Sequence, residues 1–285
     1  MLSKMVLYPS TTINCRGKLL DLSSPKIMAI VNLSPDSFYH SVDFGKPGHL
    51  MVHVENCVTD GAEIIDLGGM STRPGSKEIS VEEEWNRIKK PLWLVRKTFQ
   101  NKIVSVDTYR SEIVRRAYDE GVDIVNDVSG GAFDPDMFRT VAKLGLPYIL
   151  MHNRAKPDRM QEMTDYEDLI SEMYDYFIGK MHLLEAEGVL DIIIDPGFGF
   201  AKTIRQNYTI LKNLETFKAL GYPLLVGVSR KSMFYKLLDT APEKVLGVTT
   251  AMHFKSLEAG ASILRVHDVK EAAHCIRVFE EWKKA

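Results

Sequence analysis

The chain alternates between short apolar runs and longer stretches whose apolar residues recur with helical spacing, and this alternation restricts its possible folds more than any other feature. Eight apolar runs read as buried strands: Lys26–Asn32, Glu63–Leu67, Ile103–Asp107, Asp123–Asp127, Tyr148–His152, Ile192–Asp195, Leu224–Ser229 and Ser262–His267. Parallel strands need a helix-length crossover, so strand-helix alternation is typical of a parallel sheet. Eight such units without a polar linker favour an α/β fold, a single (β/α)8 TIM barrel, over a doubly wound open sheet.

The stretches between these runs carry the start and stop signals of helices. Helices are predicted at Val81–Phe99, Ser111–Glu120, Asp134–Leu144, Tyr166–Glu187, Ile204–Leu220, Glu243–Ala259 and Val269–Lys284. Ser80 with Glu83 three residues later has the pattern of a capping box at a helix start. Gly121, Gly145 and Gly188 stand where helices are expected to end, because glycine readily adopts the left-handed conformation of a helix terminus.

The first 25 residues precede this alternation and have a different pattern. Two short segments, residues 11–14 and 18–22, flank Arg16-Gly17, which predicts a small β-hairpin. Ser23-Ser24-Pro25 then separates the hairpin from the first apolar run. We therefore predict an N-terminal hairpin extension over residues 1–25 and one barrel domain over residues 26–285.

Composition excludes several classes of protein. The formal net charge of −2 and the pI near 6.5 provide no basic surface for nucleic acid or for an anionic membrane. No apolar run approaches the roughly 20 residues that cross a bilayer. The three cysteines are far apart and form no C-x-x-C pair, which predicts neither a disulfide framework nor a zinc site. These features predict a soluble, cytoplasmic protein that binds neither nucleic acid nor a membrane.

Polar residues or glycines follow every predicted strand. In chain order they are Asn32, Gly68-Gly69 leading to Ser71-Thr72-Arg73-Pro74, Asp107, Asn126-Asp127, Met151-His152-Asn153, Asp195, Ser229-Arg230-Lys231-Ser232, and Arg265 with His267. A single polar residue at a strand end is explained by a turn or a helix cap. In a barrel, however, the carboxyl ends of all the strands meet at one face, where active sites lie. A ring of polar groups there predicts a binding site.

One part of this ring suits a flat, nitrogen-rich heterocycle. Asp107 and Asp195 offer carboxylates that accept paired N–H donors, and Asn126 adds both a donor and an acceptor. Met151 and Phe200 offer apolar walls for the faces of such a ring.

The other part of the ring is cationic and suits an anion. Lys231, Arg265 and His267 follow the last two strands, a sector that binds phosphate in many barrels. Lys231 has a second interpretation as a Schiff-base lysine, although no nucleophile-and-base pair accompanies it. Asn32, with Asp36 or Asp43, offers oxygen ligands for Mg²⁺ beside a diphosphate, or else forms only a turn.

Seven sequence blocks, in this order, resemble the signatures of the dihydropteroate synthase family. They are Ile30-Val31-Asn32-Leu33-Ser34-Pro35-Asp36-Ser37-Phe38, Asp66-Leu67-Gly68-Gly69-Met70-Ser71-Thr72-Arg73-Pro74-Gly75, Ser105-Val106-Asp107-Thr108-Tyr109, Asn126-Asp127-Val128-Ser129-Gly130, Asp195-Pro196-Gly197-Phe198-Gly199-Phe200, Ser229-Arg230-Lys231-Ser232 and Arg265-Val266-His267. The resemblance spans about residues 11–285. It implies the condensation of 6-hydroxymethyl-7,8-dihydropterin diphosphate with p-aminobenzoate, giving 7,8-dihydropteroate and diphosphate, by a cytoplasmic homodimer of folate biosynthesis.

The resemblance also implies roles for individual residues. Lys231, Arg265 and His267 would be catalytic. The pterin diphosphate would contact Thr72, Asp107, Asn126, Met151, Asp195, Lys231, Arg265 and His267. The p-aminobenzoate would contact Thr72, Arg73, Pro74, Phe200, Lys231 and Ser232. Asn32 would bind Mg²⁺.

One segment departs from the family pattern. The family usually continues Ser-Phe with Ser-Asp-Gly-Gly, whereas here Phe38 is followed by Tyr39-His40-Ser41-Val42-Asp43, so no role is assigned to His40 or Asp43. Two alternatives stay open at this point. One is a pterin-binding methyltransferase that uses methyltetrahydrofolate, which would share the Asp107, Asn126 and Asp195 pocket. The other is a non-catalytic pterin-binding protein, which the changed loop would favour.

Overall fold

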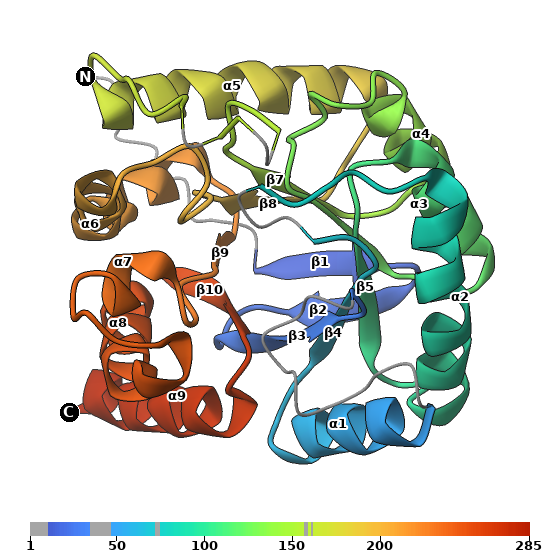
Figure 1. The fold of residues 1–285 in the computed structure, drawn as a ribbon, viewed down its shortest axis with the longest axis horizontal. Helices are drawn as coiled ribbons and strands as arrows, with labels where there is room; N and C mark the ends of the chain where they lie inside the picture. Colours follow the sequence, from blue (N-terminus) through green and yellow to red (C-terminus); the bar gives the residue numbers. More distant parts are fainter. Residues whose placement is uncertain (1–10, 35–46, 72–74, 157–158, 161) are drawn as a thin grey trace, which may run out of the picture.

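Eight parallel strands close into a barrel that is surrounded by helices (Figure 1). The computed structural model describes residues 11–34, 47–71, 75–156, 159–160 and 162–285. The barrel strands are β3 (Lys26–Asn32), β4 (Ile64–Gly68), β5 (Ile103–Asp107), β6 (Ile124–Asp127), β7 (Tyr148–Met151), β8 (Ile192–Asp195), β9 (Leu224–Val226) and β10 (Ala261–Val266). They follow one another in chain order, and β10 pairs with β3 to close the ring. The predicted (β/α)8 barrel is confirmed.

The helices lie on the outside of the barrel. They are α1 (Pro47–Thr59), α2 (Val81–Thr98), α3 (Ser111–Asp119), α4 (Met137–Leu144), α5 (Leu169–Glu187), α6 (Ile204–Lys212), α7 (Ser232–Tyr235), α8 (Leu246–Glu258) and α9 (Val269–Lys284), with 3₁₀ turns at Leu214–Leu220 and Pro242–Lys244. The sequence prediction missed α1, although Leu50, Val54 and Cys57 are buried at helical spacing. It also joined α6 to the following 3₁₀ turn. The Asn213 side chain donates to the Thr209 carbonyl at 2.8 Å, and this local bond competes with the continuing helix.

Helix ends show which sequence signals were reliable. Gly145 and Gly188 adopt left-handed conformations at the ends of α4 and α5, as predicted. The Ser80 hydroxyl accepts a hydrogen bond from the Glu83 N–H, but the Glu83 carboxylate pairs with Arg87 at 2.5 Å. The expected capping box is therefore formed on one side only.

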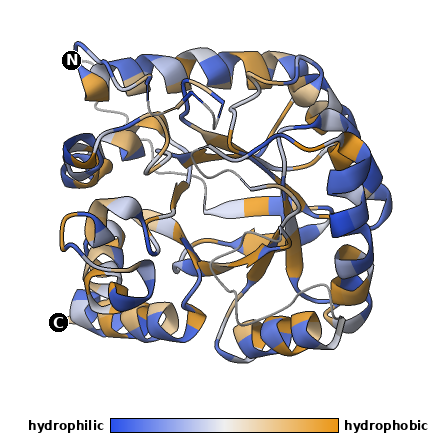
Figure 2. Cartoon of the chain, in the orientation of Figure 1, coloured by the Kyte–Doolittle hydropathy of each residue, from blue (hydrophilic) through white to orange (hydrophobic). Residues whose placement is uncertain are grey.

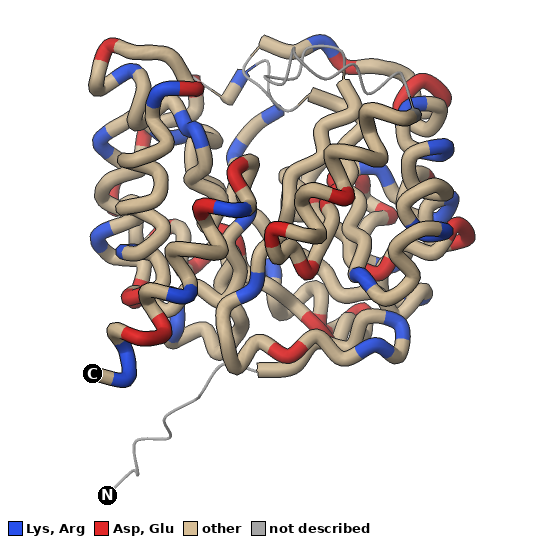
Figure 3. Tube along the Cα trace, turned by 90° about the horizontal axis from the view of Figure 1, so that it is seen from below, with Lys and Arg blue, Asp and Glu red and all other residues tan. Residues whose placement is uncertain are grey.

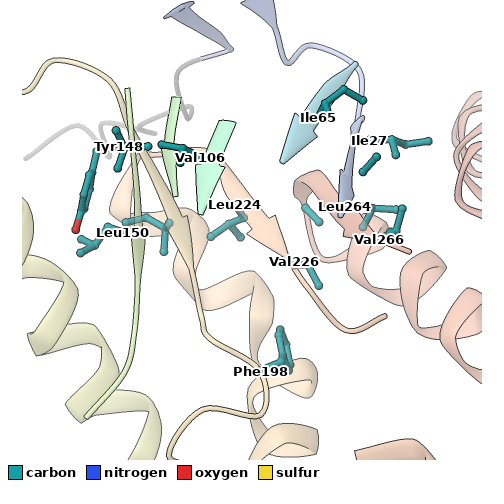
Figure 4. Packing of buried hydrophobic residues seen from close by; sticks show 14 of the residues in the cluster. Ile27, Ile65, Val106, Tyr148, Leu150, Phe198, Leu224, Val226, Leu264 and Val266 are labelled. Carbon is teal, nitrogen blue, oxygen red and sulfur yellow. The ribbon is translucent and has the colours of Figure 1, made fainter. Parts of the chain in front are cut away.

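Apolar side chains fill two layers because successive residues of a strand point to opposite faces. Ile65 and Leu67 of β4 face outward and pack under the helices, whereas Ile64 faces the inside of the barrel. Figure 4 shows part of the outer layer, including Leu150 and Leu264 between strands and helices. The strands are mainly hydrophobic and the helices are banded with hydrophilic residues, consistent with their places inside and outside (Figure 2).

The predicted N-terminal hairpin closes the end of the barrel opposite the strand carboxyl ends. Its strands β1 (Thr12–Cys15) and β2 (Lys18–Asp21) pair antiparallel, and both residues of the tight turn, Arg16 and Gly17, have positive φ. Ile13 and Leu20 pack against the inward residues of the barrel strands. Arg16 Nη1 donates to the Tyr118 carbonyl at 2.8 Å, which fixes the hairpin against the last turn of α3.

Charged residues of both signs are interspersed along the chain (Figure 3). On the helical surface many form pairs, such as Arg116 with Glu82 at 2.7 Å and with Glu112 at 2.8 Å. Within the described ranges, no helix combines the length and hydropathy that a bilayer crossing requires.

The hairpin offers a matched test of its own contribution to stability. Leu20 is 4% exposed and Leu19 beside it is 72% exposed. Leu20→Ala should lower the free energy of unfolding by about 2–5 kcal/mol, because it leaves a cavity at the end of the barrel. Leu19→Ala should change it by less than about 0.5 kcal/mol. Urea unfolding followed by circular dichroism measures both, and equal effects would contradict the packing described here.

Candidate active site

The register of the barrel brings polar strand ends into one row. Asn32 of β3 pairs with Gly68 of β4, Gly68 with Asp107 of β5, and Asp107 with Asn126 of β6. A Cβ atom at Gly68 would lie 3.5 Å from the Asp107 Cβ and 3.6 Å from the Asn32 Oδ1. Gly68 therefore keeps the space between these two side chains open. Farther round the barrel, Met151 of β7 pairs with Asp195 of β8.

A buried ionic network lies behind this row. Arg265 of β10 donates from Nε to Asp66 Oδ2 at 2.7 Å and from Nη2 to Asp107 Oδ2 at 2.6 Å. Asn126 Nδ2 donates to the same Asp66 oxygen at 3.0 Å. Burial raises the pKa of Asp107, and the Arg265 guanidinium opposes this shift. The network fixes the orientations of Arg265, Asp107 and Asn126, which all come from different strands.

Asp66 is a site residue that the sequence prediction did not include. It lies within the apolar run of β4, and its partner Arg265 is 199 positions away in the chain. The only sequence signal for it is a carboxylate in the middle of an apolar strand, which needs a buried partner. Asp66 is 1% exposed. It orients the other members of the network and does not line the surface of the pocket.

The network keeps acceptor capacity for a ligand. Among the described residues, Asp66 Oδ1 and Asp107 Oδ1 are buried oxygens without a hydrogen-bond partner. Buried carboxylate oxygens are nearly always satisfied in folded proteins, so an unpartnered one can accept from an N–H donor of a ligand. The heterocycle site itself stays a prediction.

Lys231, Asp195 and Phe200 form the adjoining part of the site. Lys231 Nζ lies 4.7 Å from the centre of the Phe200 ring, a cation–π contact. Burial, together with the positive charge of Arg265, lowers the pKa of Lys231 to about 8, and Asp195 opposes the shift. Asp195 accepts a hydrogen bond from the Gly197 N–H at 2.8 Å, and burial raises its pKa. Lys231 is therefore a cation whose charge changes in the neutral to mildly alkaline range.

Met151 and Phe200 contribute the apolar surface that the sequence predicted. Met151 belongs to a small buried cluster with Met70, Tyr109 and Val128. Phe200 is partly buried against the same cluster. These side chains offer a flat, polarisable surface of the kind that covers the face of an aromatic ligand.

His267 and Ser232 belong to the cationic part of the predicted site. The His267 N–H donates to Ser229 Oγ at 3.2 Å, and Asp268 forms two hydrogen bonds to Arg230. These bonds join the loop after β9 to the loop after β10. Ser232 begins α7. A cavity of about 560 Å³ lies beside His267, between α1 and the start of α9.

Several predicted residues lie outside the described ranges. These are Thr72, Arg73 and Pro74, together with Asp36, His40 and Asp43 of the segment that departs from the family pattern. Of the predicted metal ligands, Asn32 is described, at the end of β3. No group of three His, Cys, Asp or Glu side chains suited to a metal ion occurs in the parts of the chain that the structure covers.

Known proteins resemble this chain over nearly its whole length. The sequence profile of the family described as pterin binding enzyme matches residues 28–267. The dihydropteroate synthase of Synechocystis is 43% identical over 255 residues, which is 88% of each chain. That of Escherichia coli is 39% identical over 267 residues, or 93% of this chain and 94% of the relative. The chain belongs to the dihydropteroate synthase family.

Solved structures of dihydropteroate synthases have the same fold. A Yersinia pestis dihydropteroate synthase in a sulfonamide drug complex superposes with a TM-score of 0.92, at 34% identity, covering 96% of this chain and all of that one. A Xanthomonas albilineans dihydropteroate synthase with 4-aminobenzoic acid gives 0.88 at 32% identity, covering 97% and 99%. Dihydropteroate synthases are transferases, and the assignment supports this activity over the methyltransferase and the non-catalytic alternatives.

The role of Asp66 can be tested without substrate. Asp66→Asn removes one of the two charges that balance Arg265, and it does so at a buried position, so we expect the free energy of unfolding to fall by about 2–4 kcal/mol. Asp119→Asn, on the exposed surface of α3, is the matched control and should change it by less than about 0.5 kcal/mol. Chemical denaturation at neutral pH measures both. An unchanged midpoint for Asp66→Asn would remove Asp66 from the network.

Proposed function

We propose that this protein joins 6-hydroxymethyl-7,8-dihydropterin diphosphate to p-aminobenzoate. The aniline nitrogen forms a bond to the pterin methylene carbon, the bond from that carbon to the diphosphate oxygen breaks, and one N–H proton is released. The products are 7,8-dihydropteroate and diphosphate. The observation that carries this proposal is the buried network of Arg265, Asp66, Asp107 and Asn126, which leaves the Asp107 Oδ1 atom for an N–H group of a pterin.

The pterin is expected to lie across this network and against Met151. Its N–H donors would meet Asp107 and Asp195, while Asn126 pairs with a mixed donor and acceptor edge. Lys231 donates to a ring acceptor from the side of Phe200. The buried position of Asp195, at 6% exposure, makes such a charged hydrogen bond stronger than it would be in water.

The diphosphate end is expected at the cationic side of the site. His267 and Arg265 supply positive charge where negative charge develops on the leaving group. The amide oxygen of Asn32 fits Mg²⁺, which takes oxygen ligands and commonly completes its coordination with phosphates and water. When bound there, the ion would neutralise the departing diphosphate. Of the described residues, Asn32 offers one oxygen for the ion, at the end of β3 in the row of strand ends.

The displacement of diphosphate by the aniline nitrogen needs little general acid or base catalysis by the protein. The pterin ring can spread the positive charge that develops on its methylene carbon, which favours a loose, SN1-like transition state. The aniline nitrogen is a competent nucleophile once water is excluded. We expect p-aminobenzoate beside Phe200, Lys231 and Ser232, with Thr72, Arg73 and Pro74 completing this part of the site. The roles of residues 72–74 rest on the family resemblance.

The decisive experiment is an assay of diphosphate release with the dihydropterin diphosphate, p-aminobenzoate and Mg²⁺. We expect release to require p-aminobenzoate and to fall when Mg²⁺ is removed by chelation. Asp195→Asn should weaken pterin binding by about 1–3 kcal/mol, because a charged acceptor is lost. Absence of p-aminobenzoate-dependent release from the folded wild-type protein would refute the proposal.

The lowered pKa of Lys231 predicts a pH dependence. The ammonium is present below about pH 8 and is lost above it, so kcat/KM for the dihydropterin diphosphate should fall on the alkaline side with an apparent pKa near 8. In Lys231→Arg the side chain stays charged, so residual activity should keep its value to higher pH. Steady-state kinetics across the pH range test this. An alkaline decline at the same pH in both proteins would assign it to another group.

We further propose that the protein is cytoplasmic and forms a homodimer. The three cysteines are unpaired and buried, as is common in a reducing compartment. Leu237 and Leu238 after α7, and Val278 and Trp282 on α9, are large apolar side chains that are more than half exposed. Figure 1 shows α7, α8 and α9 grouped on one side of the barrel, where such a surface suits a second copy. Sedimentation velocity distinguishes a dimer from the 32.3-kDa chain.

A further inference from the structure

A buried ammonium group lies behind the turn that carries Phe200. Lys202 is 5% exposed, although lysine is among the side chains that are most rarely buried. Its Nζ lies 2.9 Å from His152 Nδ1, 3.0 Å from the Gly197 carbonyl oxygen and 2.9 Å from the Phe200 carbonyl oxygen. A fourth acceptor, the His152 carbonyl oxygen, lies at 3.3 Å. Lys202 thus connects the segment after β7 with the segment after β8.

The surroundings of Lys202 show that it donates to neutral groups. No described carboxylate lies within ion-pair distance of its Nζ. Burial lowers the pKa of Lys202 to about 7; Asp195 opposes the shift, and Lys231 and Arg154 add to it. Burial also lowers the pKa of His152 to about 2, with Lys202 as the next cause, so the imidazole is neutral and its Nδ1 accepts. Burying an ammonium in this way is costly, which indicates that its hydrogen bonds serve a purpose.

The backbone carbonyl oxygens of the turn that precedes Lys202 need a buried hydrogen-bond donor. Gly197, Gly199 and Ala201 have φ values of 70°, 84° and 49°, so left-handed residues alternate along it. This path directs the Gly197 and Phe200 carbonyl oxygens toward one point, where Lys202 Nζ lies. Converging buried carbonyls without a donor would leave unsatisfied acceptors.

The same turn is fixed from two other directions. Asn207 Oδ1 accepts from the Gly199 N–H at 2.7 Å. The Tyr166 hydroxyl donates to the Ala201 carbonyl oxygen at 3.0 Å. On its inner side, the turn presents the Phe200 ring to Lys231. The place of this ring in the site therefore depends on bonds that are made on the opposite side of the backbone.

We propose that Lys202 is a positioning residue that holds the Gly197–Ala201 turn in shape and so sets the Phe200 ring against p-aminobenzoate. The inference rests on the proposed function, because that function assigns p-aminobenzoate to Phe200. Lys202 acts through backbone carbonyls and touches neither substrate. The network of Asp66, Asp107, Asn126 and Arg265 has no direct bond to Lys202. Asp195, which accepts from the Gly197 N–H of the same turn, is the pterin contact that the loss of Lys202 would reach, so the pterin end should be affected less than the p-aminobenzoate end but not left untouched.

Lys202→Met tests the proposal, because methionine keeps most of the length and apolar volume while removing the donors. We expect KM for p-aminobenzoate to rise by about tenfold or more. The dissociation constant for dihydropterin diphosphate, measured by calorimetry, should change by less than about threefold. Lys212→Met, at the exposed end of α6, is the matched control and should leave both unchanged. A folded Lys202→Met protein with the wild-type KM for p-aminobenzoate would overturn the inference.

A second variant decides the matter if Lys202→Met does not fold. Tyr166→Phe removes the outer hydrogen bond to the Ala201 carbonyl together with the hydroxyl's contact to Arg154, and KM for p-aminobenzoate should rise by about threefold without a change in pterin diphosphate binding. An unchanged KM there would also overturn the inference. The two proposals fail differently. A wild-type protein without p-aminobenzoate-dependent diphosphate release refutes the function, whereas an active wild type with unaffected variants refutes only the role of Lys202.

Discussion

Closure of the parallel barrel is the constraint on which the rest of the structure depends. Once β10 pairs with β3, the carboxyl ends of all eight strands form one ring, and the register decides which residues are neighbours across it. Asn32, Gly68, Asp107 and Asn126 are brought into one row although they are far apart in the chain. The helices and the hairpin stabilise this ring, and the ring in turn positions the chemistry.

Two cations maintain the site, and they are balanced in different ways. Arg265 is held by the carboxylates of Asp66 and Asp107, so its charge is compensated directly. Lys202 is held by backbone carbonyls and by neutral His152. The bonds from Arg265 to the two carboxylates fix side chains at the predicted heterocycle site. The bonds from Lys202 fix the course of the backbone at a turn that contains several left-handed residues.

Much of the fold could be predicted because each signal is local. Buried parallel strands appear as apolar runs, and the polar residues that end them, such as Asp107 and Asp195, are then placed at the carboxyl ends by the topology alone. The roles of Asp66 and Lys202 were not predicted. A carboxylate inside a strand and a lysine after a glycine-rich turn have no local sign of their partners. Lysine is mostly solvent-exposed, so only the folded structure reveals that Lys202 is enclosed.

The hairpin at the amino-terminal end of the barrel has a consequence for how this chain can change. Its contacts, made by residues such as Ile13 and Leu20, lie at the end of the barrel opposite the catalytic ring. Substitutions at separated positions usually have independent effects. The closed end can therefore accumulate changes that raise or lower thermal tolerance while turnover is preserved. At the open end the demands of durability and selectivity are joined, because Asp66 and Arg265 both stabilise the fold and position the site.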